Sequence, residues 1–192
     1  AQKEPRMKQN RLTISINKSA DEICDHSINP IHTHKWYDSV VRNIADEHPP
    51  RVWTIHKVWW SSDECSTYTI TQYERNRLVV FSSYESDYSV RYVFRPLTDT
   101  TTEMVYFEWG ETGELDGPCG IENLERLKFL VEMNIDILPF EASDFQWWMG
   151  LTRRQMRPYF DYWSEQEMQE WLRKALESET VKVVLRDGVR VG

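Results

Sequence analysis

The stretch "SVRYVFRPLTDTTTEMVYFEW" (residues 89–109) decides the fold class, because two apolar-aromatic runs flank a short polar turn. Side chains of an extended strand point alternately to the two faces of its sheet. One face of the first run is apolar or aromatic, and the other is mainly polar. The apolar face consists of Tyr88, Val90, Tyr92 and Phe94. The pattern predicts an antiparallel hairpin in a half-buried sheet, whose aromatic face covers either a solid core or a cavity.

Further strands and helices are predicted on the N-terminal side of this hairpin. Alternation in residues 12–16 indicates an opening strand, and Ser19 precedes Glu22 by three residues, which is the spacing of a helix capping box. A second helix is expected to begin near Thr33 and to end by His48. Its apolar stripe would be Trp36, Tyr37, Val40, Val41 and Ile44. Extended runs at residues 52–60, 66–74 and 77–83 then complete an antiparallel meander with the hairpin.

The C-terminal part of the chain is predicted to be mostly helical. Residues 121–134 carry a leucine-rich stripe at helical spacing, with Glu and Lys opposite. A second capping box, Ser164 with Glu167, predicts a helix over residues 165–178. Asp187-Gly188 between valine-rich arms is a strong signal for a final β-hairpin.

Composition narrows the class of protein. A chain of 192 residues with 40% hydrophobic and 28% charged residues most simply forms one globular domain with an appendage. A net charge of −8 argues against broad binding to a nucleic-acid backbone. No apolar run approaches the roughly 18 residues of a membrane-spanning helix. Three widely spaced cysteines suggest reduced thiols and a cytoplasmic location, with no disulfide framework or zinc site.

The order of the elements resembles the START-like helix-grip (SRPBCC) superfamily over roughly residues 11–134. The resemblance is carried by "LTISINKSADEICDHSINP", "KWYDSV", "TYTITQYERNRLVVFSS" and "YSVRYVFRPLTDTTTEMVYFEW". It implies an α+β fold in which a curved antiparallel sheet wraps around a helix and leaves a cavity. Members of the superfamily use this cavity for lipids, sterols, polyketides or plant hormones, and others have enzymatic, chaperone-regulating or ribosome-associated roles. Here the domain would span residues 11–138, after a flexible leader (residues 1–10), and a helical extension ending in the hairpin would span residues 139–192.

The leading functional hypothesis is a protein that binds a small hydrophobic or aromatic molecule in this cavity. Apolar rings would supply contact area, while His56 and tyrosine hydroxyls would orient the ligand. The expected ligand-binding residues are Trp36, His56, Tyr68, Ile70, Tyr88, Tyr92, Phe94 and Tyr106. The strand parity of His56 and Tyr106 stays open, because apolar residues flank both of them.

Motifs give an enzyme little support. No G-x-S-x-G, phosphate-binding glycine loop or activated cysteine occurs, so no catalytic residue and no cofactor is predicted. His26, His32 and His34 lie close in sequence but lack the convergent ligands of a zinc site, so no metal is predicted either. A cyclase- or hydrolase-like enzyme that uses the cavity, with His56 as its base, is left as a minor alternative.

The extension carries the second main hypothesis, a structural or regulatory interaction protein. Aromatic residues and arginines gather in residues 145–163, which is the composition of interface hot spots. The expected partner-binding residues, for a homo-oligomer or another protein, are Trp147, Trp148, Arg153, Arg154, Arg157 and Tyr159. A small core of the extension's own is the competing interpretation, and nucleic acid is disfavoured by the acidic remainder of the chain.

Overall fold

The computed structural model describes residues 8–112, 115, 117–155, 164, 166–167, 169–170, 173–174 and 182–190. The chain divides into two compact units, residues 1–133 and residues 134–192. None of the helices in this described part has the length and apolar character needed to cross a membrane.

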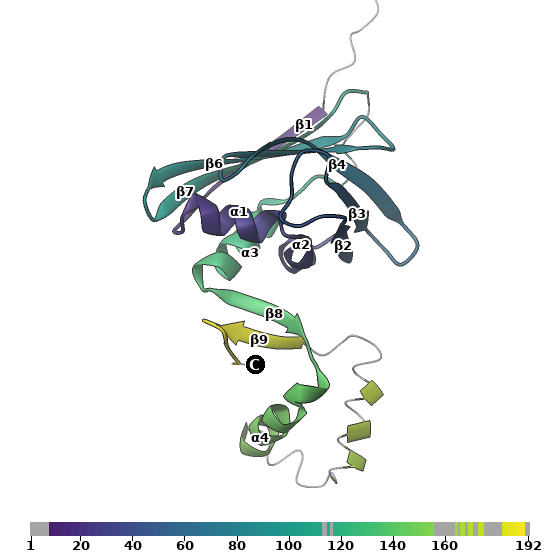
Figure 1. Cartoon of the computed structure of the whole chain (residues 1–192), viewed down its shortest axis with the longest axis vertical. Helices are drawn as coiled ribbons and strands as arrows, with labels where there is room; N and C mark the ends of the chain where they lie inside the picture. The colour runs from purple at the N-terminus through teal and green to yellow at the C-terminus, as the bar shows by residue number, and fades with distance from the viewer. Residues whose placement is uncertain are drawn as a thin grey trace, which may run out of the picture. The chain divides into compact units, whose positions relative to one another are not determined.

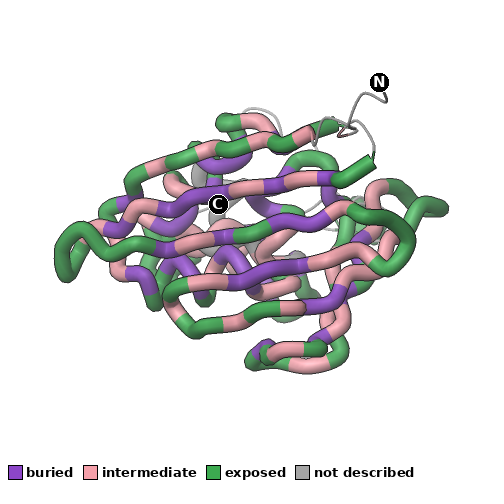
Figure 2. Tube along the Cα trace, turned by 90° about the horizontal axis from the view of Figure 1, so that it is seen from above, coloured by how far each residue is buried: buried purple, intermediate pink, exposed green. Residues whose placement is uncertain are grey.

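A seven-stranded antiparallel sheet forms the framework of the first unit, with strand order β1-β7-β6-β5-β4-β3-β2. The strands are β1 (Lys8–Ile16), β2 (Arg42–Ala45), β3 (Ile55–Trp59), β4 (Cys65–Glu74), β5 (Leu78–Ser83), β6 (Ser89–Thr98) and β7 (Thr101–Gly110). Strands β6 and β7 form the predicted hairpin, and Tyr92 pairs with Tyr106 across it. Buried residues alternate with exposed ones along the strands, as Figure 2 shows from the outer side of the sheet. The alternation assigns one face of the sheet to the core.

Three helices cover that inner face: α1 (Ala20–Ile28), α2 (Pro30–Trp36) and α3 (Ile121–Glu132), all on one side of the sheet in Figure 1. The capping box at Ser19 and Glu22 is present at the start of α1, as predicted. Asn29 then separates α1 from α2 and caps α2 through its side-chain oxygen, with Pro30 in the first turn. Leu124, Leu127 and other apolar residues of α3 are buried. The fold class is therefore α+β, with an antiparallel sheet folded over a helix as the resemblance implies.

The second predicted helix is wrong beyond Trp36. The backbone becomes extended at Tyr37, and residues 42–45 form β2, which pairs with β3. The residues assigned to one helical stripe do not share a buried face: Val40 is buried, whereas Val41 and Ile44 are exposed. The backbone hydrogen bonds to β3, which lies ten or more residues downstream, decide this structure, so a local helical pattern did not reveal it.

The second unit contains a three-stranded sheet of β8 (Ile135–Pro139), β9 (Lys182–Arg186) and β10 (Val189–Arg190), with η1 (Ala142–Asp144) and α4 (Phe145–Gln155). The predicted turn is present: Asp187 and Gly188 both have positive φ between β9 and β10. Strand β8 was not predicted. The capping box of Ser164 and Glu167 is also present. Of the expected helix over residues 165–178, Gln166, Glu167, Gln169, Glu170, Arg173 and Lys174 are helical, and the rest lies outside the described residues.

The boundary between the two units follows Met133, five residues before the expected end of the first domain at residue 138. Strand β1 begins at Lys8, within the expected leader of residues 1–10. Residues 1–7 lie outside the described residues.

We expect residues 1–133 to fold without the second unit, because all seven strands and the three helices lie within them. A fragment of residues 1–138 should fold too but aggregate more readily, because β8 would lose its partner β9 and expose an unpaired strand edge. Circular dichroism melting curves and light scattering of the two fragments test this. If only the fragment of residues 1–138 folds, or neither fragment does, then the first unit needs residues of the second unit in order to fold.

Candidate functional site

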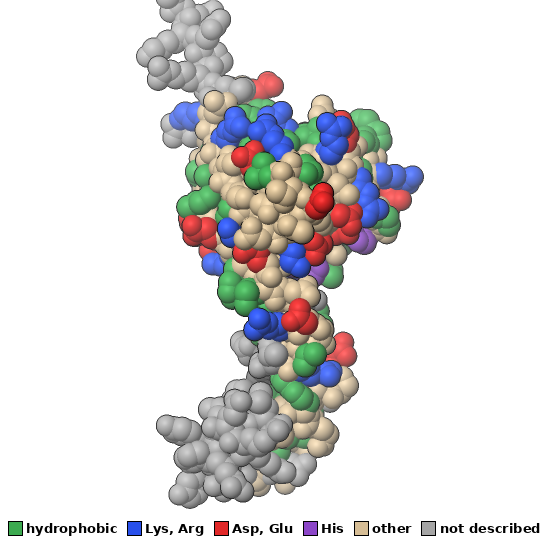
Figure 3. Space-filling model, turned by 90° about the vertical axis from the view of Figure 1, so that its left-hand side faces the viewer, with side chains coloured by type: hydrophobic (Ala, Val, Ile, Leu, Met, Phe, Trp, Pro, Cys, Tyr) green, Lys and Arg blue, Asp and Glu red, His purple; other side chains and the backbone are tan. Residues whose placement is uncertain are grey.

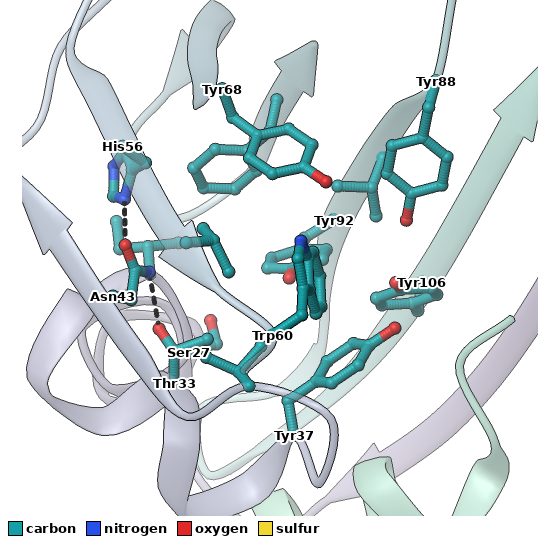
Figure 4. A pocket seen from close by; sticks show the side chains of 15 residues that line it. Ser27, Thr33, Tyr37, Asn43, His56, Trp60, Tyr68, Tyr88, Tyr92 and Tyr106 are labelled. Carbon is teal, nitrogen blue, oxygen red and sulfur yellow. Dashed lines mark hydrogen bonds between the residues drawn. The ribbon is translucent and has the colours of Figure 1, made fainter. Parts of the chain in front are cut away.

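A pocket of about 60 Å³ lies between the inner face of the sheet and the segment that runs from the end of α1 to β2. Figure 4 shows that most of the side chains around it are aromatic and point toward a common centre. The rings that line it are Tyr37, Trp60, Tyr68, Phe81, Tyr88, Tyr92 and Tyr106. The aromatic face of the β6–β7 hairpin therefore covers a packed core at one end and a small cavity at the other.

Five of the eight residues expected to bind a ligand line this pocket: His56, Tyr68, Tyr88, Tyr92 and Tyr106. The open strand parities are resolved by the sheet register. His56 and Val58 face inward on β3, while Lys57 between them is exposed. Tyr106 is buried on the inner face of β7, opposite Tyr92. That these five residues bind a ligand stays a prediction.

The other three residues, Trp36, Ile70 and Phe94, are buried in the packed core and do not line the pocket. Trp36 packs edge-on against the rings of Tyr37 and Tyr92, with centroid distances of 5.5 and 6.2 Å. It therefore supports the pocket wall from behind. Alternation alone could not separate these residues from the lining ones, because both kinds face inward.

Ile70 is covered by the loop before β3, since its backbone exchanges hydrogen bonds with Trp53 and Thr54. Phe94 lies six residues along the strand from Tyr88, which is roughly 20 Å at the rise of an extended chain. It faces inward where α1 packs on β6, beyond the end of the pocket.

Sequence reasoning missed several lining residues, of which Tyr37, Asn43 and Trp60 matter most. Tyr37 and Asn43 fell within the mispredicted helix, so their approach to β3 was not visible. Trp60 lies at the end of the "VWW" run, where both faces are apolar. Phe81 had a usable signal, because it stands two residues from Val79 on the inner face of β5.

His56 occupies one end of the pocket, and a directional chain of hydrogen bonds fixes its protonation. Asn43 Nδ2 donates to Thr33 Oγ1 at 2.9 Å, which leaves Asn43 Oδ1 to accept from His56 Nδ1 at 3.2 Å (Figure 4). The proton therefore lies on Nδ1, and Nε2 is a hydrogen-bond acceptor. His56 is 2% exposed, and its Nε2 has no hydrogen-bond partner among the described residues. Burial lowers the pKa of His56 to about 4, so the ring is neutral at pH 7.

Glu108 is a buried carboxylate behind Tyr88 and Tyr106 of the pocket wall, and it is 2% exposed. Its Oε1 accepts hydrogen bonds from Asn10 Nδ2 and the Cys119 backbone N–H, both at 2.7 Å. Its Oε2 accepts from the hydroxyls of Tyr88 at 2.6 Å and Tyr106 at 3.3 Å. These four donors satisfy the charge and tie together β1, β6, β7 and the loop before α3. Alternation on β7 could have revealed Glu108, because it shares the inner face with Tyr106.

The tyrosines of the pocket are poor bases or nucleophiles at neutral pH. Burial raises the pKa of Tyr88, Tyr92 and Tyr106 well above the ordinary value, and it raises the pKa of Tyr68 to about 12. Their hydroxyls therefore stay protonated and act as hydrogen-bond donors or acceptors. The same effect of burial raises the pKa of Cys119 to about 12, so this thiol is not activated.

A larger cleft of about 620 Å³ adjoins the pocket. Tyr37, Trp60, Tyr68 and Tyr88 line both spaces and form the neck between them. Their rings are in edge-to-face contact in succession: Tyr37 with Trp60 at 6.3 Å, Trp60 with Tyr68 at 6.4 Å, and Tyr68 with Tyr88 at 6.1 Å. The wall of the cleft beyond the neck is polar, with Ser39, Ser66, Ser83, Ser86, Glu64, Glu85 and Asp87.

The remaining candidate residues lie elsewhere. His26 stacks on His32 at 4.3 Å, and in the part of the chain that the structure describes no group of three or more His, Cys, Asp or Glu could hold a metal ion. In the second unit, Trp147 and Trp148 pack against the buried pair Phe140 and Val183. Arg153 and Arg154 belong to α4, but their side chains lie outside the described residues, as do Arg157 and Tyr159 altogether.

No protein-family model matches the sequence, and no curated protein matches it. Solved structures do match the fold. A conserved protein of unknown function from Enterococcus faecalis is 15% identical with a TM-score of 0.56, covering 67% of this chain and 74% of its own. A norcoclaurine synthase mutant from Thalictrum flavum, in complex with a transition-state analogue, is 12% identical with a TM-score of 0.51, covering 68% and 97%. The Aha1 dimer from Colwellia psychrerythraea is 15% identical with a TM-score of 0.51, covering 65% and 96%. At such identities the likeness shows the fold alone, which is the helix-grip fold.

Proposed function

We propose that this protein binds a small, mainly apolar or aromatic molecule in the pocket on the inner face of its sheet. The observation that carries the proposal is a pocket of about 60 Å³, walled by aromatic rings and sharing four of its lining residues with a cleft of about 620 Å³. Protein interiors are normally packed without voids larger than a water molecule. Seven converging rings that leave such a space are typical of a binding site.

The two volumes indicate how a ligand would lie. Pockets for small organic molecules measure roughly 300–1,000 Å³, so the inner space alone admits only one end of such a molecule. The ligand would place a ring or short apolar group beyond the neck and leave its larger part in the cleft. His56 and the tyrosine hydroxyls would then contact the inner end, and Trp60 and Tyr68 would contact the middle.

The interaction hypothesis gains less support. Trp147 and Trp148, its proposed anchors, are already in contact with Phe140 and Val183 in the small core of the second unit. Binding through the extension, a homo-oligomer and a cytoplasmic location stay predictions, as does an enzymatic use of the pocket.

Native mass spectrometry of the wild type and of the Val58→Phe variant tests the proposal. Val58 is a buried residue of the pocket wall, and phenylalanine adds four carbon atoms at a place where space exists. We expect the wild type to retain a non-covalent small molecule, added from an extract or a fragment library, and the variant to lose it. Thermal stability should change little, because overpacking costs about 1–3 kcal/mol only where no space is available.

Val93→Phe is the matched control, since Val93 is half-buried on the outer face of β6 and cannot reach the pocket. This variant should bind as the wild type does. Equal ligand retention by Val58→Phe and the wild type would contradict binding in this pocket.

A further inference from the structure

The charged residues among the described lining of the cleft are all acidic. Glu64, Glu85, Asp87 and Glu108 line it, and no Lys, Arg or His is among the described lining residues. Glu85 accepts hydrogen bonds from the Thr67 N–H and Ser83 Oγ, and these bonds keep the pKa of its carboxyl below the usual value. Asp87 is held below its usual pKa by the Thr112 side chain and N–H. At neutral pH the wall therefore carries negative charge.

Acidic residues alone do not make a site, but here they adjoin an aromatic pocket in which one buried, unpartnered atom is a hydrogen-bond acceptor. That atom is Nε2 of His56, buried and unpartnered among the described residues. The strongest donors nearby are already used: Tyr88 and Tyr106 donate to Glu108, and Trp60 Nε1 donates to Ser66 Oγ at 3.0 Å. A ligand therefore meets His56 Nε2 as an acceptor in the pocket and carboxylates in the cleft, beside tyrosine and serine hydroxyls that can donate or accept.

Basic residues are placed on the opposite side of the sheet. Arg11, Arg91 and Arg95 lie on the outer face by their register with Phe107 and Glu103. Figure 3 shows Lys and Arg side chains gathered over this outer face, at the top of the view. The negative charge of the cleft is thus not neutralised from within, and a cleft lined by one sign of charge raises the local concentration of ions of the other sign.

From this arrangement we infer that the ligand is a protonated organic amine with an apolar or aromatic end. The inference rests on the proposed function, because the apolar end occupies the pocket. The ammonium group lies in the cleft, near the carboxylates of Glu64, Glu85 and Asp87 and the ring faces of Trp60 and Tyr68, which also attract cations. A metal ion fits less well, since these acids are spread along the wall and no metal-binding group of three is found among the described residues.

Three probes with one ring and different charge test this inference: benzylamine, benzyl alcohol and benzoate. Their affinities are measured by NMR titration of the full-length protein at pH 7, following the Trp60 indole N–H, which is assigned with a Trp60→Phe variant. We expect benzylamine to bind about tenfold more tightly than benzyl alcohol at low ionic strength, and benzoate to bind most weakly. The preference should shrink when salt is added, because salt screens charges near a surface.

The Glu64→Gln/Glu85→Gln double variant should lose most of the preference for benzylamine and keep its affinity for benzyl alcohol. Each exposed carboxylate is expected to contribute about a 1.4- to 5-fold effect. Asp99→Asn is the control, because Asp99 is an exposed acid at the opposite end of the β6–β7 hairpin. It should leave all three affinities unchanged.

The outcomes separate the two proposals. If benzyl alcohol or benzoate binds as tightly as benzylamine, the pocket binds ligands but the inference about charge is wrong. If none of the probes shifts the Trp60 signal at millimolar concentration, both the proposed function and this inference are overturned. If the salt dependence is absent in the wild type, the carboxylates do not act on the ligand.

Discussion

Replacing Glu108 by leucine is expected to lower the free energy of unfolding by about 2–6 kcal/mol, because two fixed N–H groups would each lose an acceptor. Leucine would leave the Cys119 N–H without an acceptor, and Asn10 Nδ2 would keep only one of its two acceptors. These two donors are fixed by the backbone and by the Asn10 Nδ2 bond to Cys119 O at 2.9 Å, so they cannot turn elsewhere. Each buried unsatisfied donor costs about 1–3 kcal/mol.

Glu108→Gln is expected to lower the free energy of unfolding by less, about 1–2 kcal/mol, because it preserves the hydrogen bonds at one of the two oxygens. The glutamine oxygen can accept from Asn10 and Cys119, while its NH₂ group faces the hydroxyls of Tyr88 and Tyr106. These hydroxyls can rotate and accept a hydrogen bond instead of donating one. The free energy of unfolding should therefore decrease in the order wild type, Glu108→Gln, Glu108→Leu. This order indicates a carboxylate with fixed donors at one oxygen and rotatable donors at the other.

Urea unfolding followed by tryptophan fluorescence measures these differences. Glu103→Leu is the control, since Glu103 is on the same strand but faces the outer side and forms a surface ion pair with Arg95 at 3.2 Å. Its loss should cost less than about 1 kcal/mol. If both Glu108 variants are as stable as the wild type, the four hydrogen bonds do not hold this part of the pocket wall together.

The β6–β7 hairpin was predictable because the pattern that defines it lies within one short stretch of sequence. The alternation of Tyr88, Val90, Tyr92 and Phe94 gave the inner face, and this face placed Tyr88 and Tyr92 at the pocket. The same alternation could not distinguish Phe94, which faces inward in the packed core, from Tyr92, which faces inward at the cavity. The position of a cavity depends on which helix covers which part of the sheet. The alternation of residues along one strand does not contain this information.

Pairing between strands that are distant in sequence explains the two larger errors of the sequence-based prediction, the second helix and the missed strand β8. Residues 42–45 follow a helical stripe but form β2, because β3 offers them a row of free backbone groups. This pairing also places Asn43 next to His56, so the contact that sets the tautomer of His56 was hidden by the same error. Strand β8 was missed for a comparable reason, since its partner β9 is more than 40 residues away in sequence. The fold of the first unit was thus predictable in outline, and the detail of its site was not.

The second large effect is a loss of stability below pH 6.5 that depends on His56. The pKa of His56 is about 4 in the folded protein, because burial opposes the charged ring and the nearby Asp46 offsets this only in part. An unfolded chain has a histidine pKa of about 6.5. Between these values the unfolded state binds more protons than the folded state, so the free energy of unfolding falls as the pH falls from about 6.5 to about 4. The contribution of His56 is at most about 3 kcal/mol over this window.

His56→Phe should remove this pH dependence while keeping a ring of similar shape. The variant loses the hydrogen bond to Asn43, which lowers its stability by a constant amount at every pH. The informative quantity is therefore the difference in unfolding free energy between wild type and variant, which should narrow as the pH falls from 6.5 to 4. Urea denaturation at half-unit pH steps measures it, with His34→Gln, at an exposed position of α2, as the control that keeps the wild-type slope. A difference that stays constant with pH would mean that His56 titrates normally in the folded protein, and its ring would then not be held neutral at the inner end of the pocket.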